Sequence, residues 1–215
     1  LFAYDYLASS CFYDFDAPWS ASAYGALVEG RAKCDGISLA MKWLCEEMGL
    51  KCMVIAGTQP GQSVGHAWNL IQIGGVYYDL DVTNDVRTEE QRVRFYGAFN
   101  VSGNWIRAKY PENFSFSGFL NIPAADSMDM SYHALRGSYV PQGADPQQTL
   151  FRRLENAGED EAVYIQFEST QQYQSFINDI NHIMSQWDGL SKGSFNYSLS
   201  HLDEFQVCCL KVSFL

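Results

Sequence analysis

A cysteine near the first clear helix of the chain has a position suited to covalent catalysis. Cys34 follows Gly30 and stands directly before a segment with helical periodicity. A thiol at the start of a helix faces unpaired main-chain N–H groups and the positive end of the helix dipole, and both favour the nucleophilic thiolate. Arg31 and Lys33 would add positive potential, which Asp35 partly offsets. Cys34 is therefore a candidate nucleophile, and a packed structural thiol is the alternative for an isolated cysteine.

His66 and Asp81 are the residues that could activate this thiol. An imidazole can take up the thiol proton, and a carboxylate can hold the imidazole in the required orientation. Taken singly, His66 could be a satisfied half-buried histidine and Asp81 a hydrogen-bonding residue at a strand end. The catalytic interpretation requires that the fold bring all three side chains together.

The elements around these residues predict an α+β fold. From Asp35 to Met48 apolar residues recur at intervals of three and four, and Gly49 stands where helices commonly end. Three segments then have strand character: 50–57, 65–73 and 76–83. We expect the helix that carries the cysteine to pack on an antiparallel sheet.

The pair Gly74–Gly75 is typical of a two-residue hairpin turn and sets the register of the last two strands. That register predicts Trp68 opposite Asp81 and His66 opposite Thr83, with His66 and Asp81 as diagonal neighbours on one face. Diagonal residues lie about 7–8 Å apart at the backbone, a gap that an imidazole and a carboxylate can close. One hairpin would therefore supply an oriented histidine.

Elsewhere the sequence predicts a helix over residues 1–10 and a short one over 21–29, begun by Ser20 and ended by Gly30. Residues 88–123 are rich in aromatic residues, Asn, Gly and Pro, which indicates short elements and loops.

The composition of the chain predicts two domains that meet near the segment IPAADSMDM. Residues 1–125 would form the catalytic core, and residues 126–215 a smaller accessory α+β unit. In this second part, the segments 161–169, 170–187, 193–200 and 205–215 predict the order strand, helix, strand, strand. Because this βαββ unit has no cluster of catalytic residue types, we expect it to serve an accessory role, with a protein partner as one possibility.

The runs GALVEGRAKCDGISLAMKWLCEEMGLKCMVIAG and GHAWNLIQIGGVYYDLDVTND resemble the transglutaminase-like superfamily of papain-type cysteine enzymes. The resemblance covers about residues 24–85 and does not extend to the last ninety or so. It implies a papain-like core of a bacterial peptidase-like protein, with Cys34 as nucleophile, His66 as base and Asp81 as orienting residue. Family members often carry an aromatic residue after the DVT element, where this chain has Asn84, and the second donor of the oxyanion hole has no candidate.

These residues lead to a hypothesis of thiol-dependent acyl transfer on amides of a protein or peptide substrate, through a thioester acyl-enzyme. Water would give hydrolysis, the outcome we favour, and a lysine amine would give transglutaminase-type cross-linking. The alternative from another class is a non-catalytic surface module that uses this fold for binding.

Net charge and motifs exclude several other classes. A formal charge of -11 without any Lys/Arg cluster disfavours nucleic acid as a partner, and there is no apolar run of about 20 residues to span a membrane. The cysteines form no zinc-type CxxC array, so we expect no metal or cofactor and interpret the five other cysteines as buried free thiols. Because the chain starts at Leu1 without Met, we expect an exported or cell-surface protein, with a cytoplasmic location as the alternative.

One acidic run has the spacing of a calcium loop but lacks its other features. Asp79, Asp81, Thr83, Asp85 and Glu90 match the ligand positions of such a loop. The position that requires Gly for the sharp turn is Asn84, and the run follows a predicted strand. We therefore expect no calcium there.

Overall fold

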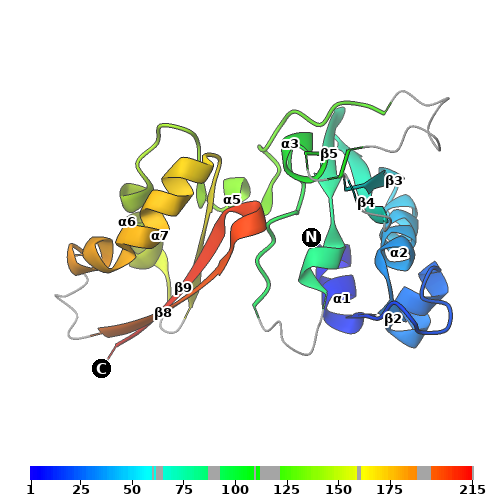
Figure 1. The fold of residues 1–215 in the computed structure, drawn as a ribbon, viewed down its shortest axis with the longest axis horizontal. Helices are drawn as coiled ribbons and strands as arrows, with labels where there is room; N and C mark the ends of the chain where they lie inside the picture. Colours follow the sequence, from blue (N-terminus) through cyan, green and yellow to red (C-terminus); the bar gives the residue numbers. More distant parts are fainter. Residues whose placement is uncertain are drawn as a thin grey trace. The chain divides into compact units, whose positions relative to one another are not determined.

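The computed structural model describes residues 1–59, 61, 65–86, 93–108, 110–111, 122–158, 161–187 and 195–214. They form two compact units, Leu1–Ser131 and Tyr132–Leu215, each with helices and a sheet of its own (Figure 1). The sequence-based division lies a few residues earlier, between 125 and 126, and the catalytic and accessory roles of the two parts remain predictions.

The first unit contains the two helices that lead to the cysteine. α1 (Phe2–Ser10) and α2 (Cys34–Glu47) confirm the predicted helices, and Gly49, with φ +74°, ends α2. α2 begins one residue earlier than expected, because Lys33 is the N-cap and Cys34 already has helical geometry. Cys34 is thus the first residue of the helix and does not lie outside it.

The segment between these helices differs from the prediction. The chain is helical over 23–29 and ends at Gly30 (φ +66°), close to the predicted 21–29, but residues 25–29 form a π-helix, η1 (Gly25–Glu29), and Ser20 is not its cap. The Ser20 hydroxyl donates to the Phe15 carbonyl (3.1 Å) and caps nothing. It is Ser22 whose hydroxyl accepts from the Gly25 N–H (3.2 Å). Several residues nearby favour helix starts, so the sequence alone does not distinguish between them.

The sheet of the first unit has the order β3–β4–β5 and is antiparallel throughout, which confirms the predicted topology. Its strands are β3 (Lys51–Thr58), β4 (Gly65–Ile73) and β5 (Val76–Leu80). Gly74 and Gly75 both have positive φ and form the predicted two-residue turn, and the ladder runs from Ile73↔Val76 to Asn69↔Leu80.

The last strand is shorter than predicted. β5 ends at Leu80, and Asp81 caps a 3₁₀ turn, η2 (Val82–Asp85), by accepting from the Thr83 N–H (2.9 Å). The expected cross-strand pairs of Asp81 with Trp68 and of Thr83 with His66 are therefore wrong. The physical reason is that the aspartate side chain offers the backbone a local hydrogen bond in place of the ladder.

Helix α2 covers the sheet and forms the core of the first unit with it (Figure 1). The face that α2 buries includes Ile37, Ala40, Met41 and Cys45. The sheet face toward α2 carries Asn69, whose amide donates to the Ser38 carbonyl (2.9 Å), together with the buried Ile71, Tyr78 and Leu80. This arrangement is the expected α+β core, in which the helix bearing the cysteine packs on an antiparallel sheet.

Two smaller pairings complete this unit. β1 (Phe12–Tyr13) and β2 (Arg31–Ala32) form a short parallel pair just before α2. On the far edge, Asp79 of β5 pairs with Val101, shortly before the one-turn helix α3 (Gly103–Ile106). The buried Asp79 carboxylate accepts two hydrogen bonds from the Arg107 guanidinium, both 3.0 Å.

The second unit contains the predicted strand, helix, strand, strand, together with elements that the sequence analysis missed. The sheet order is β6–β7–β9–β8, and only the β6–β7 pair is parallel. The predicted elements are β7 (Ala162–Phe167), α7 (Thr170–Ser185), β8 (Phe195–Leu202) and β9 (Val207–Phe214). The additional ones are α5 (Tyr132–Leu135), β6 (Tyr139–Val140), α6 (Pro146–Asn156) and the 3₁₀ turn η4 (Asp203–Phe205).

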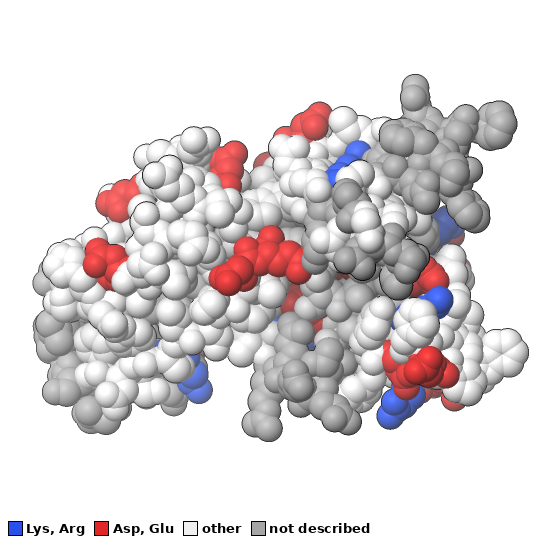
Figure 2. Space-filling view, in the orientation of Figure 1, with Lys and Arg blue, Asp and Glu red and all other residues white. Residues whose placement is uncertain are grey.

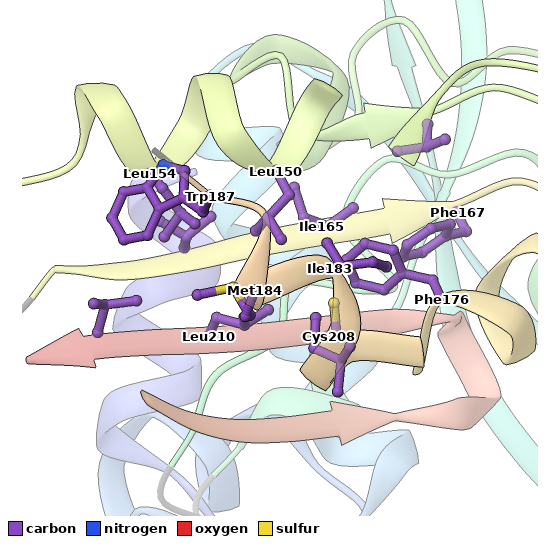
Figure 3. Close-up of a cluster of buried hydrophobic side chains, with 14 of the residues drawn as sticks. Leu150, Leu154, Ile165, Phe167, Phe176, Ile183, Met184, Trp187, Cys208 and Leu210 are labelled. Atoms are coloured by element: carbon purple, nitrogen blue, oxygen red, sulfur yellow. The ribbon is translucent and has the colours of Figure 1, made fainter. Parts of the chain in front are cut away.

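The core of the second unit lies where α6 and α7 meet the sheet (Figure 3). Leu150 and Leu154 of α6 pack with Ile165 and Phe167 of β7, and α7 adds a stripe that includes Phe176, Ile183 and Met184. The stripe follows the three-to-four-residue spacing that predicted α7.

Acidic side chains are spread over the face shown in Figure 2, and Lys and Arg are fewer there, in keeping with the formal charge of -11. In the part of the chain that the structure describes, no helix is long and apolar enough to cross a membrane.

Candidate active site

The start of α2 is fixed by a close approach of the preceding loop. The Lys33 N–H donates to the Ser20 carbonyl (3.0 Å). A Cβ at Gly36 would lie 2.3 Å from the same Ser20 oxygen and 2.8 Å from that of Ser22, so a side chain there would displace the loop. Glycine two residues after Cys34 thus lets the loop pack against the turn that carries the thiol.

The cations beside the cysteine are neutralised by partners. Arg31 pairs with Asp14 (2.9 Å) and Lys33 pairs with Asp35 (3.1 Å). Their expected contribution of positive potential at Cys34 is therefore reduced by a carboxylate in each case. The helix start and the histidine described next are the remaining sources of positive potential.

The structure brings His66 and Asp81 into direct contact. The Nε2 atom of His66 lies 2.6 Å from Oδ2 of Asp81. Asp81 is 2% exposed, and its carboxylate also accepts from the Thr83 N–H (2.9 Å) and from the Asn84 side-chain amide (2.7 Å). The Asp81 carboxylate is therefore held by hydrogen bonds from Thr83 and Asn84, and it in turn orients the imidazole of His66.

His66 also contacts the thiol. The Cys34 side chain lies close enough to raise the pKa of the imidazole, and because Nε2 faces Asp81, Nδ1 is the ring nitrogen left for the sulfur. Burial by itself would lower the pKa of His66, but the Asp81 carboxylate and the Cys34 side chain raise it to about 10. At neutral pH the ring is then an imidazolium, which stabilises a neighbouring thiolate.

Aromatic rings hold the imidazole from the side. The Tyr110 ring centroid lies 4.6 Å from that of His66, and the Trp68 ring is nearly parallel to the imidazole at 6.1 Å. Gly57 pairs with His66 across the sheet, and a Cβ there would lie 2.6 Å from the Tyr110 carbonyl oxygen. The absence of a side chain at Gly57 therefore allows Tyr110 to approach the histidine.

This arrangement of residues coincides with a match to a known family. Residues 2–82 match the family model described as the transglutaminase-like superfamily. Residues 2–82 are thus similar to the transglutaminase-like superfamily. Cys34, His66 and Asp81 all lie within the matched residues, at the positions where the sequence motifs suggested them.

Two solved structures are similar to parts of the chain. One is a proposed cysteine protease from Cytophaga hutchinsonii, with 20% identity and a TM-score of 0.34 over 39% of this chain and 30% of that one. The other is a TGase, with 17% identity and a TM-score of 0.34 over 66% of this chain and 34% of that one. The chain thus spans about a third of the length of each structure. No curated protein matches the chain.

The carboxylates of the acidic run in the first unit bind other groups of the protein. The Asp79 carboxylate binds Arg107, that of Asp81 binds His66, and that of Asp85 accepts from the Tyr4 hydroxyl (2.8 Å). Glu90, the last position of the calcium-like spacing, lies outside the described residues. Within the described part of the chain, no group of three or more His, Cys, Asp and Glu side chains could hold a metal ion.

Three residues of the site were missed or left unexplained by the sequence analysis. Asn84, noted only as a departure from the family pattern, binds the Asp81 carboxylate. Tyr110 lies far along the chain from His66, so no local spacing connects them. Tyr13 lies near Cys34: burial raises the pKa of its hydroxyl, and the Cys34 thiol raises it further. For Asn84 a usable signal existed, since a polar residue three positions after an N-cap aspartate can bind it.

Proposed function

We propose that the chain is a cysteine-dependent enzyme that transfers acyl groups from amides of a protein or peptide substrate. In this proposal Cys34 is the nucleophile, His66 the base and then the acid, and Asp81 the orienting residue. The observation that carries it is the position of one imidazole between the Asp81 carboxylate, 2.6 Å away, and the Cys34 side chain. The match of residues 2–82 to the transglutaminase-like superfamily supports thiol-dependent chemistry in general.

The reaction would begin with the thiol proton on His66. The Cys34 sulfur attacks the amide carbonyl carbon, and the carbonyl π electrons move to oxygen. When the C–N bond breaks, the imidazolium gives its proton to the leaving ammonia or amine, and a thioester remains on Cys34. Asp81 stabilises the charged ring throughout.

Water is the acceptor that we propose for the second half of the reaction. His66, now neutral, takes a proton from water, the resulting hydroxide attacks the thioester, and a carboxylate product leaves as the thiol is restored. A lysine amine attacking the same thioester would form an isopeptide bond, so the acceptor decides between hydrolysis and cross-linking.

The decisive experiment measures iodoacetamide labelling of Cys34 against pH by peptide mass spectrometry. We expect rapid labelling of the wild type at pH 6 and a rate at least about tenfold lower in His66→Ala, because the imidazolium no longer stabilises the thiolate. His182→Ala, which removes an exposed histidine of α7, is the control and should label like the wild type.

A second assay separates the possible acceptors. Casein is incubated with the protein and biotinylated pentylamine, and the products are examined for new amino termini, deamidated glutamine and biotin. Cleavage or deamidation that Cys34→Ala abolishes supports hydrolysis, and biotin incorporation supports the amine route. If labelling of Cys34 resembles that of an ordinary thiol, near pH 8.5, in both wild type and His66→Ala, the enzymatic proposal is wrong and a binding module becomes the better hypothesis.

A further inference from the structure

Strand β8 is an open edge of the sheet in the second unit (Figure 1). It pairs with β9 on one side, and among the strands that the structure describes none pairs with its other side. An edge of this kind presents main-chain N–H and C=O groups to which a further strand can bind.

This edge lacks the features that commonly prevent two strands from pairing. The register with β9 runs without interruption from Phe195↔Phe214 to Leu202↔Val207, so no bulge bends the edge away. The sequence of the strand, FNYSLSHL, contains no Pro, Lys, Arg, Asp or Glu. By contrast, β6 at the opposite edge of the sheet has two residues, and so short an edge offers little to a partner strand.

The side chains of β8 alternate between an apolar face and a polar face. Phe195, Tyr197 and Leu199 pack against the core that the sheet shares with α7. Asn196 and Ser198 are exposed on the other face. A strand added at this edge must therefore carry apolar side chains on the side of α7 and polar ones on the opposite side.

The surface beside this edge is almost free of charge. Helix α7 has one carboxylate, that of Asp179, and no Lys or Arg. A groove between the end of α7 and the start of β8 is lined by Asn181, Met184, Ser185, Phe195, Asn196 and Tyr197. With a formal charge of -11, two copies of the chain repel each other over most of their surface. An uncharged strip avoids that repulsion, and depletion of charge is typical of the centre of an interface.

We propose that two copies of the chain associate by antiparallel pairing of their β8 strands, because this strand is long, unbroken and uncharged and has the alternation that it requires of a partner. In a pairing centred on Ser198, Tyr197 of each copy lies opposite Leu199 of the other. The apolar faces of the two strands then meet on the side of α7.

The same register extends the contact beyond the main chain. It places His201 of the second copy opposite Phe195, beside the groove at the end of α7. The two-fold axis passes between the two Ser198 residues, and the pairing uses the open β8 edge of both copies. Assembly through this edge therefore stops at a dimer.

The test measures sedimentation equilibrium of the full chain from about 1 µM to about 200 µM. We expect the weight-average mass to rise with concentration toward twice that of the monomer. Ser198→Lys and Ser198→Glu each set two like charges opposite each other at the axis, so each should weaken the dimer by about tenfold or more.

The two signs of charge distinguish a local effect from an effect of net charge. Ser198→Lys makes the chain less negative, so a dimer opposed only by overall repulsion would become stronger in this variant. Gln148→Lys and Gln148→Glu are the matched controls, since they make the same changes at an exposed position of α6. Both should leave the dissociation constant within about twofold of the wild-type value.

Hydrogen exchange on the same samples locates the contact. We expect main-chain amides of β8 to exchange more slowly at the high concentration than at the low one. A chain that stays monomeric, or a dimer whose added protection lies outside β8, would overturn the inference. If a monomeric chain instead binds a fluorescein-labelled peptide with the sequence of residues 195–202, the edge accepts a strand from another protein, and self-pairing is equally wrong.

Discussion

His66 carries the charge on which the site depends. Its ring is buried against two aromatic side chains, where an isolated imidazole would be neutral, yet contacts with a carboxylate and a thiol raise its pKa to about 10. The imidazole therefore keeps its proton at neutral pH, the state that the proposed function requires of the acid that protonates the leaving group.

The raised pKa predicts how stability changes with pH. Since the folded chain holds this proton more tightly than the unfolded one, the stabilisation is complete below about pH 6.5, the value of an unperturbed histidine. It is lost as pH rises through the folded pKa of about 10. We expect the difference in free energy of unfolding between the wild type and His66→Gln to shrink from pH 6.5 to pH 10 in urea titrations. A difference that grows over this range would contradict the assignment of a charged ring.

Asn84 is expected to position Asp81. Its amide donates to the Asp81 carboxylate over 2.7 Å, on the same oxygen that faces His66. Asn84→Ala removes that donor, and we expect the labelling rate of Cys34 at pH 6 to fall about 10- to 10²-fold, because a hydrogen bond to a charged group contributes about 1.5–3 kcal/mol.

Asn84→Asp is the informative companion of this variant. It is similar in size but sets two carboxylates against each other, so it should also shift the pH at which the His66 ring resonances titrate in NMR. Equal behaviour of the wild type and both variants would show that Asn84 has no positioning role.

The three candidate catalytic residues could be predicted because each lies in a local motif. Cys34 has a helix start, His66 a strand pattern, and Asp81 a position counted from a glycine turn. Tyr13 and Tyr110 could not be predicted, since each lies near the site through tertiary contacts that produce no pattern in the sequence. His66 and Asp81 meet as expected, although through a 3₁₀ turn and not through the diagonal pairing that predicted it.

The elements of the first unit depend on a buried ion pair at the edge of the sheet. Asp79 of β5 is fully buried, and Arg107, just after α3, binds it with two hydrogen bonds while also donating to the Pro123 carbonyl (3.1 Å). The guanidinium thus connects β5 to the irregular segments that cross its edge.

Removal of this cation should be costly. We expect Arg107→Met to lower the free energy of unfolding by about 3–5 kcal/mol, because it leaves a buried carboxylate unpaired. Arg31→Met is the matched control, since Arg31 is 60% exposed in its pair with Asp14 and such pairs contribute no more than about 1 kcal/mol. Equal losses for the two variants in urea unfolding would be inconsistent with this account.

Element boundaries were less predictable than element types. The hairpin register followed from Gly74–Gly75, because glycine tolerates the positive φ that such a turn requires. Helix α6 was missed although Asp145 and Pro146 form a strong start signal, in which the carboxylate accepts from the Gln147 N–H (2.9 Å). β6 has two residues and is formed only by its pairing with β7, so no sequence pattern could reveal it.

The molecule as a whole consists of two units with separate cores. The buried cluster of the second unit comes entirely from residues between Val140 and Val212 and includes side chains of α6, α7 and the sheet. A core drawn from one contiguous segment is a property of independently folding domains.

Expression of residues 132–215 alone tests this independence. We expect a soluble fragment with a single cooperative thermal transition, monitored by near-UV circular dichroism through Trp187 and its neighbouring aromatic rings. Leu150→Ala should lower the free energy of unfolding of the fragment by about 2–5 kcal/mol, the amount expected for a fully buried leucine. A fragment without a cooperative transition would mean that the second unit requires the first to fold.

The burial of the other cysteines makes this protein suited to conjugation chemistry. All six cysteines are free thiols, but burial raises the pKa of Cys11 to about 11 and also raises that of Cys208 and Cys209. The pKa of Cys45 is lowered by its contact with Cys52, but Cys45 has no exposed surface that a reagent could reach. In the folded state, a mildly acidic electrophile reaction should therefore attach a fluorophore or an affinity tag at one position, the sulfur beside His66. The other thiols of the native chain would then need no substitution. The fraction of molecules that carry the tag would measure the fraction in which Cys34 and His66 are correctly placed.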